Sequence, residues 1–495
     1  MTNTPRLSTT QLDRAVGALV AAAAGDALGA GYEFGPPLSA STPVRMVGGG
    51  TFGWAPGEWT DDTSMALVIA QAAATGQDLR QEHVQDQIAA GWARWAQTAP
   101  DVGNQTRAVL SMARRAARHC GSGSVTAAQV RAAARTQHQQ AGRSGGNGSL
   151  MRTAPVALAY LHDEDALVEA ASALSALTHY DPEAAEACVL WCLAIRQAVL
   201  TGRPDVRVGL PRLDGPRQMV WAQRLDEAEN THPAGFENNG WVVQALQAAW
   251  SAITHTPIPA EDPAQSTFPA QHLQLGLEAA VRGGRDTDTV AAIAGGLLGA
   301  IHGVSAVPAV WRRILHGWAP EGLGGDITAV SMAITTGGAA PFDGNYDHYT
   351  GINTLARHPY DEGVWLGGVG ALSKLPSGVD AVVSLCRLGP HDVPDGVDHV
   401  QVWLIDNPDP QDNPNLGFVL HDTAQVLEHL RREGRTFLLH CVQAQSRTPT
   451  VAALYGACKN GVSTSQALAD IRAVLPAAAP NPAFRAALHV SAETQ

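Results

Sequence analysis

Apolar residues recur at helical spacing over the first two thirds of the chain. The spacing i, i+3, i+4, i+7, which marks one face of a helix, is met by Val16, Leu19, Val20 and Ala23 and by Met65, Val68, Ile69 and Ala72. A third stretch, 290–301, continues this spacing and is rich in small residues. Gly costs up to about 1 kcal/mol against Ala inside a helix, so we expect Gly295 and Gly296 to allow close helix packing. Residues 11 to about 320 are predicted to form a compact all-α domain.

The pattern changes after a glycine-rich stretch at 321–347, which we expect to close the helical domain and to supply a linker over 326–349. Short β-type runs follow at 380–385, 400–405 and 436–439, and a helical stretch ending at Arg435 separates the last two. Strands that alternate with helices are typical of a parallel or mixed sheet. The sequence therefore predicts two domains, a helical one at 1–325 and an α/β one at 350–495.

Composition and charge exclude several classes of protein. Hydrophobic residues make up 45% and charged residues 16% of the 495 residues, which excludes wholesale disorder and a disulfide-stapled miniprotein. Lys and Arg number 33 and Asp and Glu number 46, so the net charge is −13. Non-specific nucleic-acid binding needs a basic surface. We therefore expect no nucleic-acid partner, although a local basic patch is compatible with these numbers.

Apolar runs and cysteines bear on the compartment. No run reaches the roughly 18 apolar residues of a membrane helix, so we expect no membrane partner. The stretch 15–25 is apolar enough for a signal-peptide core, but Asp13 precedes it and cleavage there would separate it from the chemistry next to it. The six cysteines form no CxxC pair and show no regular spacing, which is typical of a reducing compartment. We therefore expect a cytoplasmic protein.

Acidic residues and threonines gather at two predicted helix starts. Residues 60–63 read Thr-Asp-Asp-Thr, residues 286–289 read Asp-Thr-Asp-Thr, and Glu33 follows the turn 25–29. A helix start needs one capping side chain, whereas each of these has a run of four. Carboxylates and hydroxyls without an accompanying Cys or His set suit Mg²⁺ or Mn²⁺ rather than Zn²⁺. We interpret the runs as parts of a two-metal site that orients a water or polarises a leaving group; capping alone is the alternative.

Five ordered motifs resemble the ADP-ribosylglycohydrolase family, in particular its dinitrogenase reductase-activating members. They are GDALGAGYE (25–33), WTDDTSM (59–65), GGNGSLMR (145–152), THYDPEAAEAC (178–188) and RDTDTVAAIAGGLLGAIHG (285–303). The resemblance implies an orthogonal bundle of helices with two Mg²⁺ or Mn²⁺ ions. Its metal-site positions fall on Glu33, Thr60, Asp61, Asp62, Asp286, Asp288 and Thr289. Glu33 is also the position that responds to the metal and substrate state in some members.

The resemblance also implies substrate-binding and catalytic residues. Backbone N–H groups of a glycine-rich loop can hold a pyrophosphate. The matching positions are Gly146, Asn147, Gly148 and Ser149, then His179 near the nucleotide, and Trp241 where relatives often carry Tyr. Asp101 and Asn104 match a loop that faces the distal ribose and its arginine, which favours arginine-linked over serine-linked ADP-ribose. The implied reaction is hydrolysis of the N-glycosidic bond, with Asp61 or Asp101 as the base.

A second motif lies in the predicted α/β domain. Residues 440–448 read HCVQAQSRT between a predicted strand and a predicted helix, a position where backbone N–H groups favour a phosphate and a reactive thiolate. This C-x5-R pattern resembles the cysteine-dependent phosphatases, nearest the dual-specificity type, over roughly 350–490. The resemblance implies that Cys441 attacks phosphorus, Arg447 holds the phosphate and Ser446 assists departure of the thiolate.

Two features of this second motif leave its activity open. The acid that would protonate the leaving oxygen is expected in one loop, with Asp406 best placed and Asp409 and Asp412 as alternatives. Ala444 stands where the phosphatase family usually has Gly, at a position whose backbone often needs the freedom of Gly. A phosphorylated substrate is therefore expected only if this domain is active.

Two other functions are open for the helical domain. It could be a catalytically inactive ADP-ribose-binding module, or an enzyme for free ADP-ribose derivatives such as ADP-ribose 1″-phosphate. Loss of metal ligands would mark an inactive module, and all seven positions are intact. The expected partner is accordingly an ADP-ribosylated protein or a small molecule that contains ADP-ribose.

Overall fold

The structure, a computed structural model, describes residues 6–323, 325–338, 346, 349, 354–389 and 392–490. By its internal contacts the chain divides into two compact units. The first comprises Met1–Pro257, His272–Val307 and Ile314–Pro341. The second comprises Ile258–Gln271, Pro308–Arg313 and Phe342–Gln495, so it includes two short segments that precede the main α/β region in the sequence.

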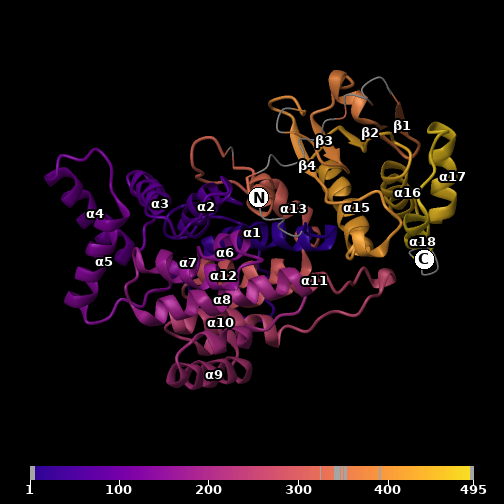
Figure 1. Cartoon of the computed structure of the whole chain (residues 1–495). Helices are drawn as coiled ribbons and strands as arrows, with labels where there is room; N and C mark the ends of the chain where they lie inside the picture. The colour runs from indigo at the N-terminus through magenta and orange to yellow at the C-terminus, as the bar shows by residue number, and fades with distance from the viewer. Residues whose placement is uncertain are drawn as a thin grey trace. The chain divides into compact units, whose positions relative to one another are not determined.

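The first unit is helical, which confirms the prediction made from the apolar spacing (Figure 1). Its helices are α1 (Thr9–Gly29), α2 (Asp61–Ala73), α3 (Glu82–Trp95), α4 (Asn104–His119), α5 (Ala127–Ala141), α6 (Ala154–Ala159), α7 (Glu164–Ala176), α8 (Pro182–Thr201), α9 (Gly215–Asn230), α10 (Val242–His255), α11 (Gln271–Arg282), α12 (Thr287–His302) and α14 (Ile327–Thr335). α1 begins with a capping box in which Ser8 and Gln11 satisfy each other's backbone N–H groups. The segment 25–29, which we expected to be a turn, is instead the last turn of α1.

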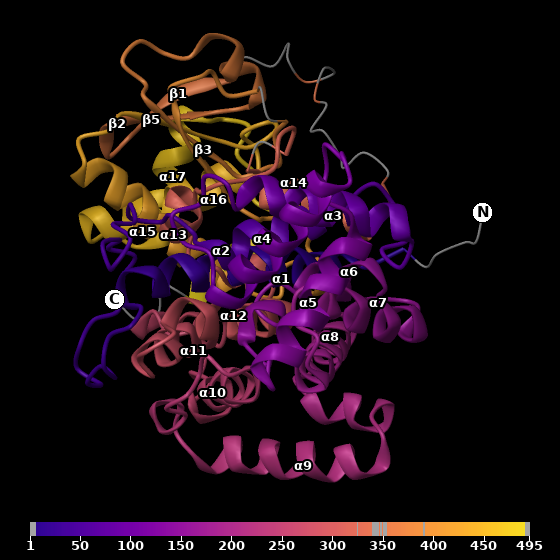
Figure 2. The same ribbon diagram turned by 90° about the vertical axis from the view of Figure 1, so that its left-hand side faces the viewer.

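Helices α1 and α12 lie side by side in opposite directions along a seam of small residues (Figures 1 and 2). A Cβ on Gly295 would lie 2.7 Å from the carbonyl carbon of Ala21, which no real side chain tolerates. A Cβ on Gly296 would meet nothing closer than Ile195 Cδ1 at 3.5 Å, an ordinary contact. The expectation of close packing is therefore confirmed for Gly295 and wrong for Gly296. The seam brings the start of α12 to the end of α1, where the predicted metal-site residues lie.

Two helical segments are longer and more apolar than the sequence reading allowed. Thr9–Tyr32 and α8 have mean hydropathy values of 1.3 and 1.4 and would suffice, by length and composition, to cross a membrane. The expectation that no run reaches that length was therefore wrong. Most of each segment is buried inside the structure, which is the environment of a core helix.

The second unit contains a mixed five-stranded sheet, which confirms the predicted α/β region. The strands are β1 (Leu355–His358), β2 (Asp361–Gly367), β3 (Ala381–Ser384), β4 (Asp398–Gln401) and β5 (Phe437–His440), in the order β1-β2-β5-β3-β4. β1 pairs with β2 antiparallel, and the other neighbours are parallel. The helices of this unit are α13 (Ala309–Ile314), α15 (Leu416–Arg432), α16 (Arg447–Asn460), α17 (Thr464–Val474) and α18 (Pro482–Val490).

Some boundaries differ from those expected. β4 ends at Gln401, so most of the run 400–405 follows the strand instead of forming it. α14 lies inside the segment 326–349 that we expected as a linker, and it packs against α1, α2 and α6. Within the second unit, Asp422 accepts a hydrogen bond from Ala309 N at 2.9 Å, and Arg313 pairs with Asp398 and Glu433. The compact units therefore do not coincide with the ranges 1–325 and 350–495.

Candidate functional site

Carboxylates from three separate segments of the first unit lie together. Ligand oxygens of Asp26, Asp62 and Asp288 lie within 4.8 Å of one another, and so do those of Glu33, Asp286 and Asp288. Asp288 belongs to both groups, so the five side chains form one continuous cluster, named here the carboxylate cluster. Helix capping alone does not require carboxylates from different helices to meet in this way.

Hydrogen bonds fix one side of the cluster between α1, α2 and α12. Asp26 Oδ1 and Oδ2 accept from the backbone N–H groups of Thr60 and Thr63, both at 2.9 Å. The Thr60 hydroxyl donates to Asp62 Oδ2 at 3.0 Å and lies 3.5 Å from Asp288 Oδ2. α1 thus supplies a cap for α2 with a fully buried carboxylate. Asp26 was missed as a site residue, although a single acid in an alanine-rich stretch was a usable signal.

The other side of the cluster is fixed by two asparagines. Asn147 Nδ2 donates to Asp286 Oδ2 at 2.8 Å and to the carbonyl of Asn239 at 3.0 Å. Asn239 Oδ1 accepts in turn from Asp286 N at 3.2 Å. The predicted Asn147 therefore holds the carboxylate of Asp286 in place. Asn239 was not predicted, because only the folded chain brings it to Asp286.

The remaining acidic candidates border the cluster through the loop before α4. Asp61 Oδ2 lies 3.4 Å from Gly103 N and accepts its hydrogen bond. Asp101 is half-buried, and Asn104 is exposed as the first residue of α4. Thr289 is buried, and its backbone N–H donates to Asp288 Oδ1 at 2.9 Å. The structure thus places all seven of the predicted metal-site positions in or beside one acidic cluster.

Burial and mutual repulsion disfavour the charged form of these carboxyls. Burial, with the charge of Asp286 next in size, raises the pKa of Glu33 to about 9 and that of Asp101 to about 6. Burial raises the pKa of Asp26 to about 6. Burial is also the largest cause that places the pKa values well above the ordinary range at Asp61, Asp62 and Asp288. Such a group of acids is stable in its ionised form only beside compensating positive charge.

Two unpartnered oxygens indicate where that positive charge fits. Glu33 Oε2 and Asp62 Oδ1 are buried, and neither has a hydrogen-bond partner among the described residues. Buried polar atoms are nearly always satisfied, so each of these oxygens has a free position for a ligand. Carboxylate and hydroxyl oxygens are the donors that hard divalent cations prefer. The donor set therefore fits a divalent cation.

The glycine-rich loop 145–149 lies against the segment that carries Trp241. Gly146 and Trp241 form an antiparallel bridge, and Val242 N donates to the carbonyl of Gly145 at 2.9 Å. Trp241 Nε1 donates to Glu183 Oε2 at 3.2 Å, which fixes the indole. Ser149, the last residue of the loop, points into the core, where it accepts from Ser175 Oγ at 2.9 Å.

His179 packs on this loop and is held by a buried hydrogen-bond chain. Positions of a Cβ on Gly146 and Gly148 would each lie 3.3 Å from His179 Nε2. Arg152 donates to Thr178 Oγ1 at 2.7 Å, and Thr178 Oγ1 lies 2.7 Å from His179 Nδ1. Arg can only donate, so Thr178 Oγ1 accepts from Arg152 and its own hydrogen can go to Nδ1; in that arrangement the ring hydrogen of His179 lies on Nε2. Burial, followed by the charge of Arg152, lowers the pKa of His179 to about 3.

Arg152 and Thr178 were not predicted as site residues. Arg152 is 1% exposed, and its guanidinium lies 3.9 Å from the centre of the Trp92 ring. A buried Arg without a carboxylate partner is costly unless its donors are engaged. Its place at the end of the motif GGNGSLMR was the available signal, but only the fold shows that it reaches Thr178.

The second motif forms a loop between β5 and α16 in the second unit. Cys441, which follows β5, is 1% exposed. Ser446 Oγ donates to Asp406 Oδ1 at 2.7 Å, and Arg447 Nε lies 3.7 Å from Asp406 Oδ2. Ala444 has φ of +56°, the left-handed region in which a non-glycine residue is strained. The loop thus adopts a glycine-type conformation with Ala at the position noted in the sequence.

The two alternative acids have other roles in the structure. Asp409 Oδ1 accepts from Gln411 N at 2.9 Å and caps a short 3₁₀ turn, in which Asp412 is the last residue. Asn481 was not predicted, yet its Nδ2 donates to Asp406 Oδ1 at 3.1 Å and its backbone N–H donates to Ser446 Oγ at 3.2 Å. Of the three candidates, Asp406 is the one in contact with the cysteine loop.

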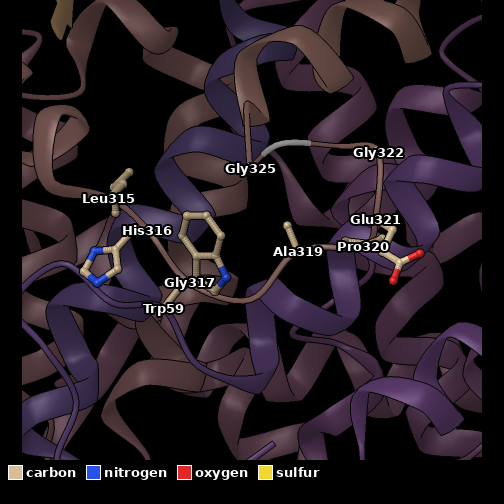
Figure 3. Close-up of a pocket in the computed structure, with 9 residues that line it drawn as sticks. All are labelled: Trp59, Leu315, His316, Gly317, Ala319, Pro320, Glu321, Gly322 and Gly325. Atoms are coloured by element: carbon tan, nitrogen blue, oxygen red, sulfur yellow. The ribbon is translucent and has the colours of Figure 1, made fainter. Parts of the chain in front are cut away.

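A cavity of about 460 Å³ lies elsewhere in the first unit (Figure 3). Its lining residues are Trp59, Leu315, His316, Gly317, Ala319, Pro320, Glu321, Gly322 and Gly325. Trp59 Nε1 donates to the carbonyl of Trp318 at 3.0 Å, so the loop holds the residue that precedes Thr60. No predicted site residue is among those that line this cavity.

Comparison with known proteins gives matches for both parts of the chain. The family model ADP-ribosylglycohydrolase matches residues 7–339. The ADP-ribosylarginine hydrolase Tri1 of Pseudomonas putida (strain GB-1) is 30% identical over 305 residues, which cover 61% of this chain and 73% of that protein. The ADP-ribosyl-[dinitrogen reductase] glycohydrolase of Rhodospirillum rubrum is 29% identical over 60% of this chain and 89% of that protein.

The C-terminal region has a more limited match. Dual specificity protein phosphatase 1 of Arabidopsis thaliana is 27% identical over 128 residues, which cover 25% of this chain. The match spans 63% of that phosphatase. Phosphatase similarity is thus confined to part of that relative's length.

Proposed function

This chain belongs to the ADP-ribosylglycohydrolase family, and we propose that its helical unit hydrolyses the N-glycosidic bond between ADP-ribose and a protein arginine. The observation that carries the proposal is the carboxylate cluster, with its shared Asp288 and its unpartnered oxygens on Glu33 and Asp62. The arginine linkage is supported by the relative named ADP-ribosylarginine hydrolase and by the residues Asp101 and Asn104 at the border of the cluster.

We infer that the metals are two Mg²⁺ or Mn²⁺ ions. The residues that would hold them are Glu33, Thr60, Asp61, Asp62, Asp286, Asp288 and Thr289. Asp26 would keep Thr60 in position by accepting a hydrogen bond from its backbone N–H. When bound, such ions supply a polarised water and stabilise negative charge at neutral pH. Their positive charge would also offset the repulsion that raises the pKa of the cluster's carboxyls.

The chain's own groups divide the remaining tasks. The backbone N–H groups of loop 145–149 can bind the pyrophosphate, and His179 can donate a hydrogen bond from Nε2 to an anionic group. Asp101 is half-buried at the border of the carboxylate cluster, so it is a candidate to take a proton from the attacking water. Asp61 is the other candidate base, but it is more deeply buried and already accepts from Gly103 N.

Release of ADP-ribose from an ADP-ribosylarginine peptide, measured by chromatography with Mg²⁺ present, tests the proposal. Asp288→Asn should abolish release and Mg²⁺ binding by calorimetry. Asp101→Asn should abolish release with Mg²⁺ binding retained, if Asp101 is the base. Asp409→Asn, in the other unit, is the matched control and should retain both. Full activity of Asp288→Asn would refute the metal mechanism.

The same measurements separate the alternative functions. An inactive binding module would bind ADP-ribose by calorimetry and release none from any linked substrate. An enzyme for free ADP-ribose derivatives would turn over ADP-ribose 1″-phosphate faster than the arginine-linked peptide. Either result would replace the arginine-linked protein as the substrate.

We propose a cysteine-dependent phosphatase activity for the second unit. The contacts of Asp406 with Ser446 and Arg447, beside the Cys441 loop, favour this function. Cys441 would attack phosphorus, Arg447 would hold phosphate oxygens, and Asp406 would protonate the leaving oxygen. Cys441→Ser should eliminate hydrolysis of p-nitrophenyl phosphate and leave release of ADP-ribose unchanged. Absence of that hydrolysis in the unaltered protein would refute the phosphatase proposal.

A further inference from the structure

One segment of the first unit has a charge opposite to that of the whole chain. Residues 104–143 contain no Asp or Glu, although the chain has 46 acidic residues against 33 basic ones. The arginines in the segment are Arg107, Arg114, Arg115, Arg118, Arg131, Arg135 and Arg143. The segment folds as α4 and α5, which pack against each other and lie at the left-hand edge of the helical unit in Figure 1, the side that faces the viewer in Figure 2. This pair of helices is named here the basic arm.

The arginines of α4 lie away from the buried face of that helix. The buried positions of α4 are Thr106, Val109, Leu110, Ala113 and Ala117. Arg107, Arg115 and Arg118 are exposed, and Arg114 is half-buried. Because residues i, i+7 and i+11 share one helix face, Arg107, Arg114 and Arg118 form a stripe that faces outward beside the packed side.

Most of these arginines form no ion pair with the part of the chain that the structure describes. Arg131 pairs with Glu82, and the guanidinium of Arg135 lies 5.1 Å from the centre of the Tyr180 ring. Within the described part of the chain, no ion pair engages the arginines of α4 or Arg143. An isolated exposed Arg is ordinary, but a run of them without any acid gives a local positive potential on an acidic protein.

The basic arm starts beside the carboxylate cluster, next to Asp61. α4 begins at Asn104, directly after Gly103, whose N–H reaches Asp61 at 3.4 Å. Burial and the charge of Asp286 raise the pKa of Asp101, and the charge of Arg107, in the first turn of α4, partly opposes that rise. In the proposed function, the modified arginine of the substrate enters the site beside the loop 101–104. A protein substrate that presents this arginine would therefore extend over α4.

We propose that the basic arm binds acidic polypeptide around the modified arginine of the substrate protein. The inference rests on the proposed function, since it assigns the substrate protein to the same site. The segment 104–143 contains no Phe, Trp or Tyr, and binding of single-stranded nucleic acid relies on aromatic stacking as well as charge. The composition therefore favours an acidic protein over a nucleic acid.

Two ADP-ribosylarginine peptides of equal length test the inference, one flanked by Glu and one by Lys. Complementary charge raises encounter rates about tenfold or more at low salt and loses this effect as salt rises. We expect kcat/KM about tenfold higher for the Glu-flanked peptide at low salt, and no preference at high salt. Free ADP-ribosylarginine, which lacks flanking residues, gives the basal activity.

Charge reversal at the outer end of the arm provides the matched comparison. Arg115→Glu with Arg118→Glu should abolish the preference between peptides and leave hydrolysis of free ADP-ribosylarginine unchanged. Arg6→Glu with Arg203→Glu alters net charge equally at exposed positions outside the arm, and should retain the preference. A preference that survives reversal at 115 and 118 would overturn the inference.

Failure of the proposed function is distinguishable from failure of the inference. If free ADP-ribosylarginine is not hydrolysed, the proposed function fails. Fluorescence anisotropy of the unmodified peptides still measures their binding to the basic arm. Tighter binding of the unmodified Glu peptide, lost on reversal at Arg115 and Arg118, would support the arm. Equal binding of both peptides, or reversal-sensitive binding of an RNA oligonucleotide in place of the Glu peptide, would overturn it.

Discussion

Two adjacent glycines of α12 should respond in opposite ways to replacement by alanine. Gly295 and Gly296 are both interior helix positions, so each replacement gains the same intrinsic helix preference of about 1 kcal/mol. They differ in what the added methyl group meets. At 295 it meets the backbone of α1, and at 296 it meets side chains that leave room for it.

The distances set the size of each effect. The Cβ of Gly296→Ala would lie 3.5 Å from Ile195 Cδ1 and 3.6 Å from Ala154 Cβ, so about 0.5–1 kcal/mol of stabilisation should remain. The Cβ of Gly295→Ala would lie 2.7 Å from the carbonyl carbon of Ala21, about 1 Å inside normal contact. Overpacking of this kind costs about 1–3 kcal/mol, and the rigid backbone places this case at the upper end. We therefore expect a net loss of about 2 kcal/mol.

Hydrogen exchange measured on peptides from α12 is the suitable assay. The chain contains two compact units, so a single unfolding transition would mix their stabilities. Exchange reports the opening free energy of the helix itself. Mg²⁺ affinity gives a second measurement, because displacing α12 also displaces Asp286 and Asp288 at its start.

Exchange in α12 should be faster than normal in Gly295→Ala and equal or slower in Gly296→Ala. Mg²⁺ binding should weaken only in Gly295→Ala. Equal protection in the two variants would refute the seam as the origin of the site's geometry. Destabilisation by Gly296→Ala alone would mean that the two faces of α12 have been assigned the wrong way round.

Three other outcomes follow from strain, hydrogen bonding and burial in the two units. Ala444→Gly relieves a left-handed φ, so it should raise the opening free energy of the cysteine loop by up to about 1 kcal/mol and slow hydrogen exchange there. Faster exchange would contradict that strain. Thr178→Val should raise the KM for ADP-ribosylarginine more than it lowers kcat and shift the ¹⁵N signals of His179, whereas Thr178→Ser should restore both; unchanged signals would exclude the proton assignment. Without metal, the melting temperature of the helical unit should fall as pH rises from about 4 to 9, because folding raises the pKa of Asp26 to about 6 and of Glu33 to about 9, so the folded state binds more protons across this window. Mg²⁺ should reverse that fall, and a melting temperature that rises with pH would contradict the sign.

The sequence was most informative where a local pattern has one physical explanation. Runs of acids and threonines at two helix starts exceed what capping requires, so their meeting around Asp288 could be predicted. A C-x5-R run after an apolar strand likewise predicted the loop at Cys441. The positive φ of Ala444 was foreseeable, because the position was identified as one where glycine is usual.

What the sequence did not reveal depends on contacts between distant segments. Gly295 and Gly296 are equivalent in a periodic pattern, and only the direction of α1 distinguishes them. Asp26 looked like part of a turn because the small residues around it hide the last turn of α1. The hydrogen bonds of Arg152 and Asn239 join residues far apart in the chain. No local rule gives such partners.

The glycine seam has a consequence for how enzymes with this architecture can diversify. The backbones of α1 and α12 are in direct contact, so neither helix can shift to accommodate a leaving group of a different shape. Adaptation to another glycosidic linkage must therefore come from the loops around the carboxylate cluster, such as 101–104, 145–149 and 238–241. A laboratory search for altered substrate selectivity should randomise those loops and leave α1 and α12 unchanged.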